Sequence, residues 1–326
     1  MLRSPLLQRA LACTLMLSTF VTASHAADTI HVANVSRTLF SMPLWIAMRQ
    51  GSMKAEGIEA TSSILDSAEK INAALRSGEM HVSMGTPEAV LMDAYKGGTL
   101  RLIAGNTRKL PHFIITRPHI KTLKDLKGAH FGILSEKEGS TYVVQDIMKS
   151  LGFTPSDYKM TAVGGAPTRW KLLQEGKIDA GLQPFPLSYV AEDAGYTNLG
   201  SVIPFVPEWQ FTSVNADLGW VDKNRPLVVR FLRALQKGRD FMTANPDETA
   251  KAAADELRTT IPLAARALAE TEKLAILDKD LALSEPGLRK VFQTLQLSGD
   301  IDTKATFDVA RFSELAMWKE SRVKKP

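Results

Sequence analysis

The sequence is almost free of cysteine. Its one cysteine, Cys13, lies in an apolar run near the N-terminus, so the rest of the chain has no thiol. Disulfide bonds, thiolate nucleophiles and cysteine-based metal sites are therefore excluded beyond that run. A chain without such cross-links needs a large apolar core, and 326 residues, 44% of them hydrophobic, are enough to form one.

Signatures of enzymes are equally scarce. The six histidines are scattered along the chain and form no H-E-x-x-H motif. There is also no P-loop, no G-x-G-x-x-G and no G-x-S-x-G pattern. We therefore expect no catalytic residue, no metal ion and no cofactor.

Charge and hydropathy exclude two further classes of protein. The net charge of +5 is a mild excess and gives no reason to expect a nucleic-acid partner. Beyond the first 26 residues, no apolar stretch approaches the ~18 residues that a membrane-spanning helix needs. There is also no low-complexity tract. We expect a globular protein that is a monomer.

The N-terminus resembles an export signal. Arg3 and Arg9 precede an apolar run at 10–21, which is followed by the small residues Ser24 and Ala26. This layout is typical of a signal peptide at 1–26 that is cleaved after Ala26, and the run is too short to span a bilayer. A membrane anchor and a lipoprotein modified at Cys13 are the alternatives. Cleavage would leave roughly 300 residues and place the protein in the periplasm.

Strand-like and helix-like segments then alternate, which predicts crossover connections and a mostly parallel arrangement of strands. The expected strands are 30–35, 58–65, 81–84, 100–104, 113–116, 129–134, 158–163 and 178–182. The expected helices between them are 43–56, 68–76, 87–95, 141–151 and 167–175. After about residue 203 the pattern becomes helical, with helices expected at 226–244, 246–257, 263–275, 285–297 and 303–317.

Two short stretches with prolines could be crossovers between lobes. They lie at 106–112 and 202–207, and proline favours stiff, extended connections there. We expect lobe I at 27–108 and 204–326 and lobe II at 109–203. The fold class is then α/β, with two lobes, each around a doubly wound mixed sheet. Ligands of such folds bind at the carboxyl ends of strands, in the cleft between lobes.

Four motifs, in order and at similar spacing, resemble a known family. They are L-R-S-G-E-M-H-V-S-M-G-T-P at 75–87, I-K-T-L-K-D-L-K-G-A-H-F at 120–131, G-S-T at 139–141, and L-Q-E-G-K-I-D at 173–179 followed by Pro184-Phe185. They are similar to motifs of periplasmic substrate-binding proteins of the nitrate/sulfonate/taurine ABC-transporter type, which include relatives of the thiamine-pyrimidine synthase. The resemblance covers about 30–200 and implies the periplasmic-binding-protein fold of type II. It also implies a small-molecule ligand and an ABC permease in the inner membrane as partner. The synthases use a cysteine-rich iron motif, which the exported part of this chain lacks.

Four groups of residues are candidates for ligand contact. The loop after the first strand contributes hydroxyls, a positive charge and an aromatic ring, in Ser36, Arg37, Thr38 and Phe40. The second group lies at two expected helix N-termini, where free N–H groups suit an anion, and consists of Ser67, Ala68, Gly85, Thr86 and Pro87. The third is the mirror position in lobe II, with Gly139, Ser140 and Thr141. The fourth follows a strand and consists of Gln183, Pro184 and Phe185, with Arg108 as a further candidate near a crossover.

Each candidate also has a purely structural interpretation. Ser67, Thr86 and Ser140 could simply cap helices. Phe40 and Phe185 could belong to the core. Weaker candidates are the glycine pair 164–165 and the residues Trp209 and Gln210.

These observations predict a binding protein whose two lobes close over a small ligand that is anionic and resembles a sulfonate, a carboxylate or a pyrimidine. An exported enzyme of the same fold is the first alternative. It would need a titratable pair in the cleft, for which Glu138 and nearby histidines are the candidates. A sensory module that reports a ligand to a membrane receptor is the second alternative, and the sequence does not separate it from the binding protein.

Overall fold

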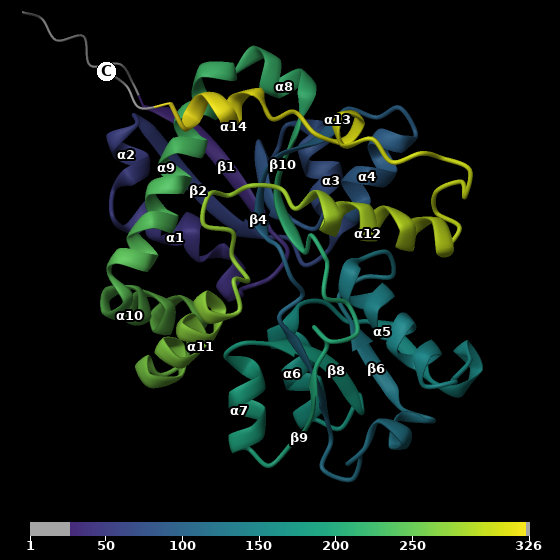
Figure 1. Ribbon diagram of the computed structural model, residues 1–326. Coiled ribbons are helices and arrows are strands. Elements are labelled where there is room, and N and C mark those ends of the chain that lie inside the picture. Colours follow the sequence, from purple (N-terminus) through teal and green to yellow (C-terminus); the bar gives the residue numbers. More distant parts are fainter. Residues whose placement is uncertain (1–26, 324–326) are drawn as a thin grey trace, which may run out of the picture.

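The computed structural model describes residues 27–323. The expected signal peptide at 1–26, with Cys13 and the cleavage site after Ala26, lies outside the described residues. The described part forms two lobes, each around a mixed sheet of five strands (Figure 1). We call them lobe I, around β2-β1-β3-β10-β4, and lobe II, around β7-β6-β8-β5-β9.

The strands of lobe I come from two separate parts of the chain. They are β1 (Asp28–Asn34), β2 (Ile58–Ile64), β3 (Val82–Gly85), β4 (Leu100–Thr107) and β10 (Thr212–Asp217). β1 runs parallel to β2 and β3, whereas β10 is antiparallel to β3 and β4. The sequence did not indicate β10, which inserts between two strands that precede it by more than 100 residues.

The helices of lobe I cover both faces of its sheet (Figure 1). They are α1 (Met42–Arg49), α2 (Ser52–Ala55), α3 (Ala68–Ser77), α4 (Glu88–Tyr95), α8 (Leu218–Lys223), α9 (Arg225–Ala244), α10 (Pro246–Leu257), α11 (Ile261–Lys273), α12 (Glu285–Leu297), α13 (Val309–Phe312) and α14 (Ala316–Ser321), with a 3-10 turn at Leu39–Ser41. None of the helices within 27–323 is both long and apolar enough to cross a bilayer.

Lobe II is one continuous segment of the chain. Its strands are β5 (His112–Thr116), β6 (His130–Ile133), β7 (Lys159–Ala162), β8 (Ala180–Pro184) and β9 (Thr197–Ser201). Its helices are α5 (Gly139–Ser150), α6 (Ala166–Gln174) and α7 (Leu187–Asp193), with 3-10 turns at Leu123–Leu126 and Pro155–Asp157. β6 is parallel to β7 and β8, and β5 is antiparallel to β8 and β9. In each sheet four strands run in one direction and one strand, β10 or β5, runs against them, so both sheets are mixed but mostly parallel, as expected.

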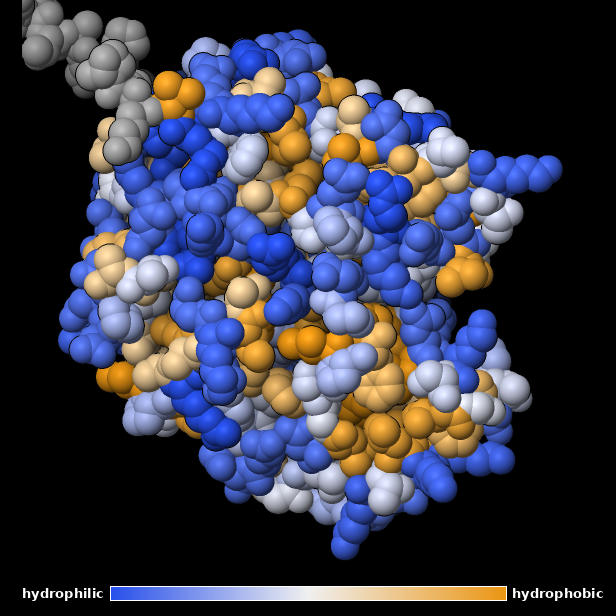
Figure 2. Space-filling model, viewed as in Figure 1, coloured by the Kyte–Doolittle hydropathy of each residue, from blue (hydrophilic) through white to orange (hydrophobic). Residues whose placement is uncertain are grey.

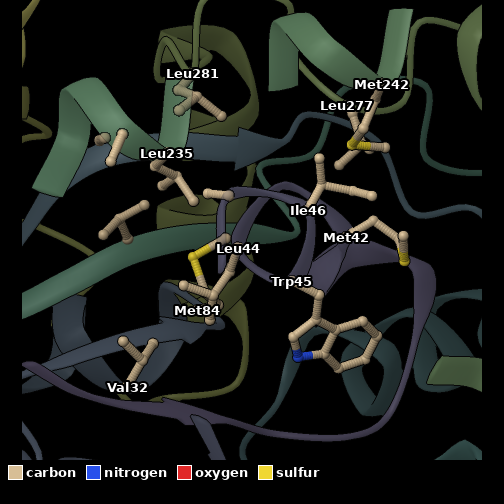
Figure 3. Packing of buried hydrophobic residues seen from close by; sticks show 14 of the residues in the cluster. Val32, Met42, Leu44, Trp45, Ile46, Met84, Leu235, Met242, Leu277 and Leu281 are labelled. Atoms are coloured by element: carbon tan, nitrogen blue, oxygen red, sulfur yellow. The ribbon is translucent and has the colours of Figure 1, made fainter. Parts of the chain in front are cut away.

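The sheet of lobe I has an apolar cluster on each of its two faces. Val32 and Ala33 are both fully buried but belong to apolar clusters on opposite faces of the sheet, as expected for successive strand residues. On the first face, Leu44 of α1 packs with Leu235 of α9 (Figure 3). The two helices approach closely because Gly238 has no side chain, and a Cβ there would lie 2.2 Å from the Pro43 carbonyl oxygen.

The segment between α11 and α12 runs along β4 as a strap. It is held by backbone hydrogen bonds from Arg108 N–H to the Ile276 carbonyl (2.8 Å) and from Gly105 N–H to the Leu281 carbonyl (2.7 Å). A Cβ on Gly105 would lie 1.9 Å from the Ala282 carbonyl oxygen, so only glycine allows this approach. We call residues 276–284 the strap.

The predictions of two helices are wrong. The helix expected at 43–56 is broken into α1 and α2, because Gly51 has a φ of 73° and interrupts the helical backbone. The helix expected at 303–317 is irregular as far as residue 308 and then forms only the short α13 and α14. The strand β9 and the helix α7 also lie where no element was expected.

Candidate functional site

Two adjoining cavities lie between the lobes. The inner cavity has a volume of about 20 Å³ and the outer one about 320 Å³. They share Ser36 and Thr38 of lobe I and Gly165 of lobe II. The inner cavity is otherwise lined by Val35, Phe40, His112, Leu134, Glu138, Ser140, Ala166, Arg169 and Phe211. The outer cavity is otherwise lined by Arg37, Ile64, Asp66, Pro167, Thr168, Pro184, Phe185, Pro186, Leu187, Leu257 and Arg258.

The loop after β1 forms the lobe I side of both cavities. Ser36 faces Gly165 so closely that a Cβ on this glycine would lie 2.4 Å from the serine Oγ. Arg37 lines the outer cavity, but its Nη1 donates to the Glu256 carbonyl (2.9 Å) and to the Glu256 carboxylate (3.2 Å). The Arg37 guanidinium therefore already has a partner on α10.

Three rings form one wall of the inner cavity. Phe40 lies edge-on to Phe211, with ring centroids 5.1 Å apart, and 5.9 Å from the ring of His112. His112 in turn lies edge-on to Phe211 at 5.0 Å. Such tilted and edge-to-face contacts hold the three rings in place.

The N-terminus of α5 brings a carboxylate into the inner cavity. Glu138 is the N-cap of this helix, and its Oε2 accepts hydrogen bonds from the Ser140 N–H, at 3.0 Å, and from the Ser140 hydroxyl. Glu138 is therefore the capping residue, whereas Ser140, the second residue of the helix, donates to it and does not itself take the capping role that was its structural alternative. The other oxygen, Oε1, has no hydrogen-bond partner among residues 27–323, although Glu138 is fully buried.

Arg169 of α6 supplies a buried positive charge. Its Nη1 donates to the Gly164 carbonyl (3.0 Å) and its Nη2 to the Leu182 carbonyl (2.9 Å), and the residue is only 4% exposed. These bonds connect the guanidinium to the loop between β7 and α6 and to strand β8. Its Nε has no partner within the described part of the chain.

A second buried carboxyl group meets lobe II behind the inner cavity. Glu88, the first residue of α4, is fully buried, and a Cβ on Gly139 of α5 would lie 2.5 Å from its Oε1. The same Cβ would lie 2.9 Å from Trp209 Nε1. Glycine at position 139 therefore lets α5 approach Glu88 and Trp209 without a clash.

Burial shifts the pKa values of these groups. It raises the pKa of Glu88 well above its ordinary value, and the negative charge of Glu138 adds to the rise. Burial also raises the pKa of Glu138, and the hydrogen bonds from Ser140 partly offset this. Burial lowers the pKa of His112 well below its ordinary value, with a further contribution from Arg169, so the imidazole is neutral at pH 7. Arg169 stays charged, because burial lowers its pKa only to about 10.

Contacts at the rim hold the lobes together on two sides. On one side, the Tyr142 hydroxyl of α5 donates to Asp300 at 3.0 Å, and Lys137 pairs with the same carboxylate. On the other side, the Arg266 guanidinium of α11 lies 3.7 Å from the centroid of the Tyr189 ring of α7. Figure 2 shows that lobe I presents a mostly hydrophilic surface in this view, whereas apolar side chains gather on the viewed face of lobe II.

The cavities bring together only part of the residues expected from the sequence. Those that line a cavity are Ser36, Arg37, Thr38, Phe40, Ser140, Pro184 and Phe185. Those that line neither are Ser67, Ala68, Gly85, Thr86, Pro87, Arg108, Gly139, Thr141 and Gln183.

Three of the residues that line neither cavity have structural partners. Ser67 caps α3 by accepting from the Lys70 N–H, and Arg108 pairs with Asp278 at 3.1 Å. Gln183 donates to the Ala166 carbonyl (3.2 Å) and accepts from the Trp170 N–H (3.1 Å) when its amide is oriented to satisfy both. These three polar side chains therefore connect elements within their own lobes.

Three charged or titratable residues of the inner cavity were missed or only touched on. His112 and Arg169 were not among the candidates, and Glu138 was considered only as the first residue of the candidate segment at 138–141 and as a catalytic group of an enzyme. They lie on β5, α6 and the N-terminus of α5, more than 20 residues apart in the sequence. Only the fold brings them together, so no local motif could have indicated them. Residues 27–323 hold no cluster of histidine, aspartate and glutamate that could bind a metal ion.

A curated relative supports a distant kinship. A protein of Brucella abortus (strain 2308) that is named as a proposed binding protein is 23% identical over 207 residues. The alignment covers 63% of this chain and 64% of that protein, so the chain matches less than two thirds of the length of its curated relatives.

Solved structures share the fold over almost the whole chain. A ligand-binding component of an ABC-type import system from Staphylococcus aureus, with zinc bound, has a TM-score of 0.73 at 13% identity and covers 90% of this chain and 99% of its own. The alkanesulfonate-binding protein SsuA of Xanthomonas axonopodis pv. citri, bound to MOPS, has a TM-score of 0.70 at 12% identity, with coverages of 91% and 99%. A Candida albicans protein described as having the generic periplasmic binding protein fold has a TM-score of 0.69 at 18% identity, with coverages of 91% and 96%.

The two lobes, their mixed sheets and the cavities between them agree with this fold, so the expected fold class is confirmed. The family model described as NMT1/THI5 like matches residues 40–249, which is more than half of the chain. The protein therefore has the periplasmic binding protein fold and belongs to the NMT1/THI5-like family.

Proposed function

We propose that the protein is the solute-binding component of an ABC-type importer, which captures a small organic molecule between its two lobes. The observation that carries the proposal is the pair of cavities whose walls come from both lobes. Ser36, Thr38 and Phe40 approach from lobe I, and Ser140, Gly165 and Arg169 from lobe II. A ligand in this position touches both lobes only when they are closed, so its binding energy favours the closed form.

The wider setting follows from the same proposal. Lobe I would comprise 27–108 and 204–326 and lobe II 109–203, in a monomer that works in the periplasm after loss of 1–26. Its partner would be an ABC permease in the inner membrane that recognises the closed form. A ligand-binding component of an ABC-type import system and an alkanesulfonate-binding protein share this fold, which supports the assignment.

Ligand-dependent closure tests the proposal. The purified protein is unfolded and refolded to remove any bound compound, and its radius of gyration is measured by small-angle X-ray scattering. Addition of a small-molecule extract of the source cells should reduce the radius of gyration, and native mass spectrometry should show the added mass. A protein that neither contracts nor gains mass would contradict the proposed function.

One observation favours the alternative of an exported enzyme. The inner cavity contains a neutral imidazole and a carboxyl group, His112 and Glu138, which is the titratable pair that such an enzyme needs. Turnover of the bound compound, lost in Glu138→Gln and His112→Gln while binding persists, would establish this alternative. Release of the compound unchanged after prolonged incubation would rule it out.

A further inference from the structure

The strap is held on its solvent side by the C-terminal part of the chain. In α14, Trp318 Nε1 donates to the Asp280 carbonyl at 2.9 Å. Arg322, which directly follows this helix, donates to the same carbonyl at 3.1 Å and to the Asp280 carboxylate at 2.6 Å. From α9, the Gln236 side chain donates to the Lys279 carbonyl at 2.8 Å. We call the Trp318 and Arg322 side chains the clamp, because both bind one turn of the strap.

Asp278 connects this turn to the end of β4. Its Oδ1 accepts from the N–H groups of Asp280 and Ala282, both at 2.9 Å. Its own N–H donates to the Asn106 carbonyl at 2.8 Å, and its Oδ2 accepts from Arg108 Nη1 at 3.1 Å. The turn that the clamp binds is therefore one residue away from the start of the crossover at 106–112.

The backbone of the strap is strained. Leu281 has a φ of 53°, and Ala275, just before the strap, has a φ of 49°. Residues with a Cβ rarely adopt this left-handed conformation, and it persists only where surrounding contacts impose it. Leu277 and Leu281 point into the apolar cluster on the first face of the sheet (Figure 3), and the clamp holds the turn between them from the other side. The conformation of the strap therefore depends on contacts from both sides.

Asn106 links the strap to the loop that lines the cavities. The residue is fully buried, and its Nδ2 donates to the Phe40 carbonyl and to Thr212 Oγ1, both at 2.9 Å. At the other end of the strap, the Ser284 N–H donates to Gln210 Oε1 at 2.7 Å, next to the crossover at 202–207. The strap thus contacts the lobe I ends of both crossovers, and one residue separates it from the wall of the inner cavity.

The helix α14 has other contacts that keep it in place. Met317 is fully buried in the same apolar cluster as Leu281. Just before the helix, the Glu314 N–H donates to the Leu102 carbonyl of β4 at 2.9 Å. The hydrogen bonds of the clamp can therefore be removed while the helix stays packed on lobe I.

We propose that the clamp controls closure of the lobes by holding the strap against β4. While the clamp is in place, Asn106 and the start of the crossover stay fixed, and the loop that carries Phe40 keeps the position that it has in the closed form. The ordering that closure requires is then largely present before a ligand binds, which reduces its entropic cost. This control of closure rests on the proposed function, whereas the hold of the clamp on the strap does not involve a ligand.

Removal of the clamp tests its hold on the strap. The double variant Trp318→Phe/Arg322→Leu keeps an aromatic ring and an alkyl chain but loses the donors to the strap. The amides that donate hydrogen bonds between β4 and the strap are Gly105, Arg108 and Asp278. Hydrogen–deuterium exchange of the ligand-free protein, followed residue by residue by NMR, should be about tenfold faster at these three amides in the double variant.

Glu320→Gln is the matched control on the same helix. The Glu320 carboxylate pairs with Arg225 of α9 at 3.6 Å, so this variant changes a charge of α14 and keeps the clamp. Its three amides should exchange at the wild-type rate, and amides of β1 and β6 should be unchanged in every variant. Faster exchange throughout lobe I would show a general loss of stability, and unchanged exchange at the three amides would show that the clamp does not hold the strap. Either result would overturn the proposal.

Closure is measured in the same variants with the small-molecule cell extract and small-angle X-ray scattering. The double variant should need about fivefold more extract than the wild type to reach half of the contraction, because its strap must be ordered during closure. Glu320→Gln should need the wild-type amount. Equal amounts for all three proteins, despite faster exchange at the strap, would overturn the control of closure.

A failure of the proposed function gives a different result. In that case the wild type does not contract at any amount of extract, and the control of closure falls with the proposed function. The exchange experiment needs no ligand, so it still decides whether the clamp holds the strap.

Discussion

Closure of the lobes should depend on pH because it buries Glu88. In the structure the Glu88 carboxyl group is fully buried against α5, and its pKa is raised well above the ordinary value, first by burial and then by the charge of Glu138. When the lobes separate, this carboxyl group gains access to water, and its pKa should return toward the ordinary value of 4.5. The closed form therefore binds a proton that the open form does not.

The sign and the size of the effect follow from this difference. A group with a raised pKa in the closed form favours closure fully at a pH below its open-form pKa, and the advantage is lost as the pH rises through the closed-form pKa. Between the two pKa values, each pH unit disfavours closure by about 1.4 kcal/mol, or about tenfold in the ratio of closed to open molecules. His112 acts in the opposite direction, because its lowered pKa disfavours closure as the pH falls below 6.5.

The substitution Glu88→Gln isolates the contribution of this side chain. Glutamine has the same shape and no charge, so the variant should lose the part of the slope that comes from Glu88 and should close more readily at neutral pH. The contribution of His112 remains in both proteins, so the difference between their profiles reports Glu88 together with its electrostatic coupling to Glu138.

The radius of gyration, measured by small-angle X-ray scattering from about pH 5 to about pH 8, reports the closed fraction for both proteins. Glu285→Gln, on the exposed N-terminus of α12, controls for loss of a carboxylate elsewhere. Identical pH profiles of the wild type and Glu88→Gln would refute the reasoning, as would a wild type that closes more readily with rising pH while Glu88→Gln does not.

Three further substitutions test other contacts. Asp300→Ala removes the acceptor of the Tyr142 hydroxyl at the rim, so the open form should gain and ligand affinity should fall a few-fold in calorimetry; unchanged affinity would show that the rim contact does not stabilise closure. Gly139→Ala places a methyl group against the buried carboxyl of α4, which should keep the lobes apart and enlarge the radius of gyration with ligand, while an unaltered radius would contradict the close approach. Gly238→Ala forces α9 away from the Pro43 carbonyl, and chemical denaturation should show a loss of about 1–3 kcal/mol in the free energy of unfolding; wild-type stability would mean that the helices shift without strain.

The sequence predicted the alternation of strands and helices well because local signals specify it. Glycines such as Gly78, which has a φ of 76°, end helices in ways that can be predicted from sequence alone. The strand β10 escaped notice because its polar sequence, T-S-V-N-A-D, becomes a strand only between β3 and β4. Its placement depends on contacts more than 100 residues away, which no local pattern contains.

The candidate site was predicted only in part, for a related physical reason. Loop positions at the ends of strands drew attention to Ser36 and Phe40, which line the inner cavity. The sequence could not show that Arg37 would be paired with Glu256 on α10, or that Glu138 and Arg169 would share a cavity. The expected anionic ligand rested on two helix N-termini and on Arg37, and the partner of Arg37 was not predictable because the fold determines it.

The strap at 276–284 limits where the molecule can bend. It fastens the β4 chain to lobe I as far as Arg108, and the returning chain is fastened beside it by the hydrogen bond from Phe211 N–H to the Thr107 carbonyl. On the far side, Val202 N–H binds the His112 carbonyl, so both chains are again paired inside lobe II. Only 109–111 and 203–209 remain between these anchors, because Gln210 also donates to the Thr107 carbonyl (3.2 Å) and accepts from the Ser284 N–H (2.7 Å). Two short connections that lie side by side permit rotation about one axis and resist twisting. We therefore expect the lobes to open and close by a hinge rotation about that axis.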